Sequence, residues 1–217
     1  MRVYHYLESK WALDDLRRRR LKLSKIDEMN DPYEWACVRS EDDASQAVLE
    51  ATRKKHIATM HGVLCFSRSW NNILMWSHYA DQHKGICLGF DVPDGEGKFM
   101  EMKYLNELVF APDLSGLPRE QKRPFFDLLY TGKYGGWSYE EEIRVFATRD
   151  RLDEENEKYF ASFDKDLKLR EVIAGARFKL SKRVIEEALE GHPAVVSKVG
   201  ISTRRFEVIL AEGGFES

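Results

Sequence analysis

Two short apolar runs, residues 62–67 and 85–90, constrain the fold more than any other feature of this chain. Each run is too short for a buried helix and is typical of a strand that is buried on both faces. Residues 71–80 between them have helical spacing, and the rest of the chain shows no strict alternation of strand and helix. The pattern predicts the α+β class, with mixed, mostly antiparallel sheets and flanking helices in a single domain over residues 1–217.

The remaining elements are predicted from periodicity and from residues typical of helix ends and turns. We expect further strands at residues 3–7, 21–24, 139–147, 169–174 and 195–211, and one or two strands within residues 99–110. We expect further helices at residues 10–20 with Ser9 as the N-cap, at residues 41–60 and 181–189, and one or two helices within residues 118–130 with Pro124 as a break or start.

Composition excludes several classes of protein. The 217 residues include 34 Lys+Arg and 37 Asp+Glu, which gives a formal net charge of −3 and argues against a bulk nucleic-acid binder. The basic run at residues 17–20 fits either a solvated helix end or a local phosphate-binding patch. No stretch has the apolar length of a membrane span or of a signal peptide, so we expect a cytoplasmic protein without membrane contact. Three cysteines without a C-x-x-C pair argue against a disulfide framework and a zinc knuckle, and we expect no metal.

Two clusters of polar and aromatic residues lie in the first 34 residues. In the first strand, alternation sends His5 to one face and Tyr4 and Tyr6 to the other. That arrangement fits a half-buried sheet as well as a binding site. The loop Asn30-Asp31-Pro32-Tyr33-Glu34 is ordinary turn chemistry, yet it also holds two carboxylates and an aromatic ring in one fixed loop of the kind that binds ligands.

A third cluster lies between the two apolar runs. The first run ends at Ser67, and the helix that follows carries Trp76, His78 and Tyr79. Trp76 and Tyr79 are spaced i, i+3 and therefore share one side of the helix, while His78 points elsewhere. Aromatic residues at this spacing pack a core as readily as they line a ligand site.

A fourth cluster is the row Glu140-x-Glu142-x-Arg144. If residues 139–147 form a strand, these three side chains lie on one face of it. Like charges in one row repel unless a partner or ligand intervenes. The row fits an edge strand that uses charge against aggregation, but a functional site explains it better.

The motifs quoted above resemble a known family. Asn-Asp-Pro-Tyr-Glu, Cys-Phe-Ser, Met-Trp-Ser-His-Tyr-Ala, Lys-Gly-Ile-Cys-Leu-Gly-Phe and Trp-x-Tyr-Glu-x-Glu-x-Arg together resemble the bacterial domain-of-unknown-function family 2971. The order of elements is more distantly similar to the His-Tyr-Glu branch of the ADP-ribosyltransferase superfamily. That similarity implies a split sheet, with His5 holding the adenosine ribose, Tyr33 or its rival Tyr79 stacking on nicotinamide, and Glu142 bonding the nicotinamide ribose.

The second resemblance implies a reaction. Nicotinamide leaves from NAD, Glu142 stabilises the ribose cation, Glu140 takes a proton from the acceptor, and Arg144 binds pyrophosphate or neutralises the glutamates. The expected protein is an NAD-dependent ADP-ribosyltransferase, a bacterial toxin or phage-defence effector. Its acceptor is RNA, DNA or protein, and an antitoxin or immunity protein is a candidate partner. The further candidate binding residues are Tyr6, Ser24, Asn30, Asp31, Glu34, Ser67, Trp76 and His78.

Two alternatives stay open on the sequence. The aromatic surfaces fit a non-catalytic sensor or interaction domain that binds a nucleotide or nucleic acid. The acidic residues fit a hydrolase or nuclease that holds a divalent ion between Asp31, Glu34, Glu140 and Glu142.

Overall fold

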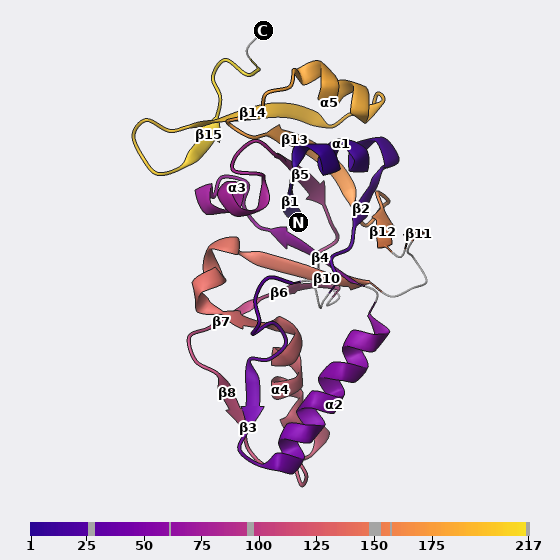
Figure 1. Cartoon of the computed structure of the whole chain (residues 1–217), viewed down its shortest axis with the longest axis vertical. Coiled ribbons are helices and arrows are strands. Elements are labelled where there is room, and N and C mark those ends of the chain that lie inside the picture. The colour runs from indigo at the N-terminus through magenta and orange to yellow at the C-terminus, as the bar shows by residue number, and fades with distance from the viewer. Residues whose placement is uncertain (26–28, 61, 95–97, 148–152, 157, 216–217) are drawn as a thin grey trace.

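A computed structural model describes the whole chain except residues 26–28, 61, 95–97, 148–152, 157 and 216–217. Its centre is an eight-stranded sheet in the order β15-β14-β13-β5-β1-β4-β10-β6 (Figure 1). Neighbouring strands run antiparallel except for the parallel pair β13 and β14. The bounds are β1 Arg2–Leu7, β4 Gly62–Ser67, β5 Ile86–Asp91, β6 Phe99–Glu101, β10 Glu142–Ala147, β13 Lys168–Ala174, β14 Val195–Ile201 and β15 Val208–Leu210.

Helices cover both faces of this sheet. On one face, α1 (Ser9–Arg18) and α5 (Lys182–Leu189) pack their apolar sides onto the main core. On the other face, α3 (Ile73–Tyr79) buries Trp76 completely against Tyr6, with the two rings edge-to-face. The described chain is therefore an α+β fold, as the sequence predicts, and none of its described helices has both the length and the apolar character needed to cross a bilayer.

Smaller sheets and two further helices extend the central sheet. Helices α2 (Asp43–Thr59) and α4 (Arg119–Thr131) pack with β3 and β8 around a separate core, in the lower part of Figure 1. The short strands pair as β3 (Val38–Ser40) with β8 (Val109–Ala111), β7 (Lys103–Leu105) with β9 (Gly132–Tyr134), and β12 (Lys158–Ser162) with both β2 (Arg20–Lys22) and β11 (Asp153–Glu155).

Several predicted details are wrong at element ends. Ser9 is the first residue of α1 rather than its N-cap, and its hydroxyl donates to the carbonyl of Lys84. The predicted strand at residues 139–147 begins only at Glu142, because residues 135–140 form a 3₁₀ helix, η2, and Glu141 adopts a positive φ of 45°. Residues 99–110 contribute to three strands, β6, β7 and β8, rather than one or two. Pro124 lies inside α4 and does not break it.

The position of β10 also excludes one interpretation of its charges. This strand pairs with β4 on one side and with β6 on the other, so it is not an edge strand. Its charged row therefore does not serve to block an exposed sheet edge.

Candidate functional site

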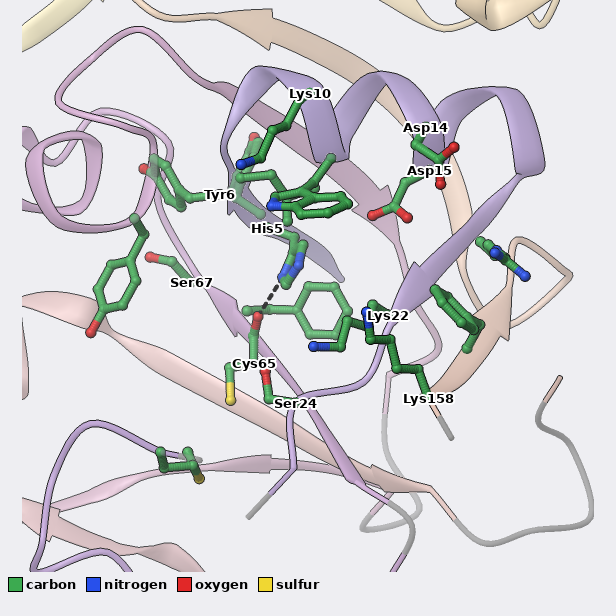
Figure 2. A pocket seen from close by; sticks show the side chains of 18 of the residues that line it. His5, Tyr6, Lys10, Asp14, Asp15, Lys22, Ser24, Cys65, Ser67 and Lys158 are labelled. Atoms are coloured by element: carbon green, nitrogen blue, oxygen red, sulfur yellow. Dashed lines mark hydrogen bonds between the residues drawn. The ribbon is translucent and has the colours of Figure 1, made fainter. Parts of the chain in front are cut away.

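A cleft of about 870 Å³ opens beside β1. Its walls come from β1, the end of β4, the start of β10, helix α1, and the strands β2 and β12 (Figure 2). Eight of the residues predicted from the sequence line it: His5, Tyr6, Ser24, Asn30, Ser67, Tyr79, Glu140 and Glu142. The sheet register explains part of this convergence, because Ser67 is the partner of both Tyr4 in β1 and Glu142 in β10.

Five buried charged residues form a network at the base of the cleft. Arg144 donates two hydrogen bonds to the carboxylate of Glu34, at 2.7 and 2.6 Å. It donates two more to Glu142, at 2.6 and 2.9 Å. Lys133 bridges Glu142, at 2.7 Å, and Glu140. Three carboxylates thus share two cations, and each member is at least nine-tenths buried.

This network sets the charge on the two glutamates that line the cleft. Burial alone would raise the pKa of Glu142, but the charges and hydrogen bonds of Arg144 and Lys133 outweigh it and lower that pKa to about 2. Burial dominates at Glu140 and raises its pKa above the ordinary value, although Lys133 and Tyr79 oppose this. Glu142 is therefore an ionised carboxylate at neutral pH, and Glu140 is the more easily protonated of the two.

Tyr79 connects the network to the wall of the cleft. Its hydroxyl donates to Glu140 and accepts a hydrogen bond from the Asn30 side chain at 3.3 Å. Burial, followed by the contact with Glu140, raises the pKa of Tyr79. The hydroxyl therefore keeps its proton and fixes one oxygen of Glu140.

His5 presents a neutral ring to the cleft. Its Nδ1 lies 2.8 Å from the carbonyl oxygen of Cys65, and a carbonyl only accepts, so Nδ1 carries the hydrogen. Burial lowers the pKa of His5, although the Cys65 carbonyl opposes this. The neutral tautomer leaves Nε2 as a hydrogen-bond acceptor. Figure 2 shows the ring between α1 and β4.

The other predicted residues lie outside the lining of the cleft. Tyr33 is 52% exposed, while Asp31 holds its own loop by accepting from the Tyr33 backbone at 2.8 Å. Trp76 is fully buried and donates to the Trp70 carbonyl, and the exposed His78 contacts the hydroxyl of Tyr139. Of the two rival tyrosines, only Tyr79 lines the cleft.

Glu34 and Arg144 also lie behind the cleft rather than in it. Arg144 is 1% exposed, and its bonded partners are the carboxylates of Glu34 and Glu142. Of the two roles considered for Arg144, the geometry supports neutralisation of the glutamates and leaves the guanidinium out of reach of a pyrophosphate in the cleft. Among the described residues, no group of three or more His, Cys, Asp or Glu side chains is arranged to hold a metal ion.

Sequence reasoning missed several residues that line the cleft. Lys133 follows a helix and belongs to no motif, so nothing local identifies it. Asp15 had a usable signal, because it lies on the buried side of α1 with Ala12 and Leu16. Lys22 and Lys158 are exposed residues of short strands, and only the pairing of β2 with β12 brings them to the same wall.

The comparisons with known proteins assign no activity to this arrangement. No curated protein and no solved structure matches the chain. A family model described as protein of unknown function (DUF2971) matches residues 75–145, which is less than half of the chain. That segment contains Tyr79, Lys133, Glu140, Glu142 and Arg144, and so most of the charged network. Over residues 75–145 the chain is therefore similar to the family of unknown function DUF2971.

Proposed function

We propose that the protein is an NAD-dependent ADP-ribosyltransferase whose reaction takes place at the Glu142 end of the cleft. The observation that carries this proposal is that an ionised, buried carboxylate, Glu142, lines the same cleft as the neutral ring of His5 and the hydroxyl of Tyr79. The cleft has the volume of a ligand of dinucleotide size.

The chemistry requires a fixed negative charge beside the reacting sugar. The bond between ribose C1′ and the nicotinamide nitrogen breaks, its electron pair leaves with neutral nicotinamide, and positive charge develops on the ribose. Glu142 is held by Arg144 and Lys133, so it is oriented before the reaction and stabilises that charge without reorganising. The acceptor then forms a bond to C1′ and loses a proton.

Glu140 is the proposed proton acceptor in that last step. Its raised pKa brings it closer to working pH than that of Glu142, which suits a general base. Proton uptake would weaken its bond to Lys133 and leave the Tyr79 hydroxyl free to turn toward the ligand. His5, with Nε2 as an acceptor, is suited to a ribose hydroxyl.

One observation favours the alternative of a non-catalytic nucleotide sensor. Both oxygens of Glu142 already accept hydrogen bonds from cations, so part of the charge is neutralised before any ligand binds. A carboxylate neutralised in this way still accepts a hydrogen bond from a ligand but stabilises a cationic transition state less. Stabilisation of the chain by NAD, without release of nicotinamide, would favour the sensor.

Release of nicotinamide from NAD, together with transfer of label from adenine-labelled NAD to bacterial RNA, DNA and protein, tests the proposal. We expect the wild type to do both and Glu142→Gln to lose at least a hundredfold in rate. Tyr79→Phe leaves the charged network intact and should lose less. Glu120→Gln, an exposed carboxylate on α4, is the matched control and should behave as wild type. Thermal unfolding checks that each variant is folded, and equal rates in the wild type and Glu142→Gln would refute the assignment.

A further inference from the structure

The outer half of the cleft carries two lysines, Lys22 and Lys158, that no carboxylate among the described residues neutralises. Lys22 in β2 is paired in register with Phe160 in β12, and Lys158 lies two residues from Phe160, so both lysines are on the same face of this small sheet. Both line the cleft, and Figure 2 shows them reaching toward its interior near His5. Within the described part of the chain, neither ammonium group has a hydrogen bond or an ion pair.

Two neighbouring arginines of the same cleft behave differently. Arg18 and Arg20 both donate to Glu155, and the guanidinium of Arg20 also lies 3.6 Å from the centre of the Phe160 ring. Two like charges on adjacent strands repel each other when nothing lies between them. The two lysines thus leave a place for an anion, and their ammonium groups suit phosphate oxygens.

Asp15 faces the same space from the opposite wall. It lies on the inner side of α1, is 5% exposed and lines the cleft, and Figure 2 shows its carboxyl group directed into it. Among the described residues no side chain or backbone group donates a hydrogen bond to it. A buried carboxyl group without a donor is costly to the fold, and a ligand hydroxyl would supply the missing donor.

We propose that the outer half of the cleft binds a ribose phosphate group, with Lys22 and Lys158 contacting the phosphate and Asp15 accepting hydrogen bonds from the ribose hydroxyls. A ribose phosphate provides an anion for the two lysines and hydrogen-bond donors for Asp15 at the same time. Inorganic phosphate would leave Asp15 without a donor, and an unphosphorylated sugar would leave the lysines without an anion. The identity of the ligand as NAD rests on the proposed function, but the binding of ribose phosphate does not.

Titration calorimetry with three probes measures the contributions of the two lysines and of Asp15 to binding separately. ADP-ribose contains both groups, pyrophosphate only the anion, and adenosine only the ribose. The double variant Lys22→Gln/Lys158→Gln should weaken ADP-ribose and pyrophosphate at least tenfold and leave adenosine unchanged. Asp15→Asn should weaken ADP-ribose and adenosine and leave pyrophosphate unchanged. Lys179→Gln, an exposed lysine outside the cleft, is the control.

A second arm identifies the source of the ribose phosphate. A short oligoribonucleotide with a 5′-phosphate is compared with the same strand without it. The inference is supported if the variants weaken binding as stated above and the ligand is either ADP-ribose or the phosphorylated strand but not the unphosphorylated one. It is overturned if neither ADP-ribose nor the phosphorylated strand binds, or if none of the variants changes their affinities. If ADP-ribose binds in this way and NAD releases no nicotinamide, the inference stands and the proposed function fails.

Discussion

Asp15 gives the fold a pH dependence opposite to that of most aspartates. Burial is the main cause of a rise in its pKa from the ordinary 3.8 to about 7, and the neighbouring Asp14 adds to it while Arg20 opposes it. The unfolded chain loses this proton near pH 4, whereas the folded chain keeps it until about pH 7. The unfolded state is therefore favoured progressively as the pH rises through this window, and the free energy of unfolding falls.

The magnitude follows from the two pKa values. A rise from 3.8 to about 7 is worth roughly 4 kcal/mol over the whole window, of which about 2–3 kcal/mol falls between pH 5 and pH 8. Asp15→Asn does not titrate and should lose this part of the dependence. Urea unfolding of both proteins at pH 5 and pH 8 gives the comparison, because every other titrating group is common to them. The wild type should lose about 2–3 kcal/mol more than the variant.

Two results would refute this reasoning. Parallel pH profiles for the wild type and Asp15→Asn would mean that the carboxyl group is solvated in the folded chain. A wild type that gains stability relative to the variant as the pH rises would mean that Asp15 has a cationic partner. Glu120→Gln removes an exposed carboxylate and is the control. Its free energy of unfolding should fall between pH 5 and pH 8 by the same amount as that of the wild type.

Three further perturbations test the base of the cleft and the sheet behind it. Arg144→Met leaves Glu34 and Glu142 buried without their shared cation and should cost about 3–5 kcal/mol in urea unfolding; a loss below 1 kcal/mol would contradict the network. Gly85→Ala places a Cβ in steric conflict with the Leu7 carbonyl oxygen and should cost about 3 kcal/mol by the same measurement, whereas an unchanged midpoint would mean that the backbone moves freely there. Tyr79→Phe removes one donor to Glu140, so we expect a loss of about 1–2 kcal/mol and slower nicotinamide release, and a rate equal to wild type would exclude Tyr79 from the reaction.

Local patterns in the sequence predict much of the central sheet. The apolar runs at residues 62–67 and 85–90 become β4 and β5, which are buried on both faces because helices cover the sheet on each side. Alternation in β1 correctly separates His5 from Tyr4 and Tyr6. These predictions succeed because burial and the two-residue period of a strand act over a few neighbouring residues.

The charged network could not be predicted in the same way. The row Glu140-x-Glu142-x-Arg144 signals an unusual site, but Glu140 belongs to η2 and not to the strand. Arg144 joins Glu142, which is two residues away, to Glu34, which is 110 residues away. Only the tertiary fold brings such partners together, and no local period encodes them.

The two ends of the cleft differ in what satisfies their charges, and this difference has a thermodynamic consequence. At the base, the oxygens of Glu142 are bonded within the chain, so a ligand adds little to their stability. In the outer half, Lys22 and Lys158 are solvated, whereas the buried Asp15 has no hydrogen-bond donor among the described residues, so the fold bears the cost of burying Asp15 until a ligand binds. A ribose phosphate ligand would then stabilise the folded chain through the outer half. Asp15→Asn removes part of the same cost before any ligand binds. At pH 8, ADP-ribose should therefore raise the free energy of unfolding of the variant by less than it raises that of the wild type. An equal increase in both proteins would show that Asp15 does not contact the ligand.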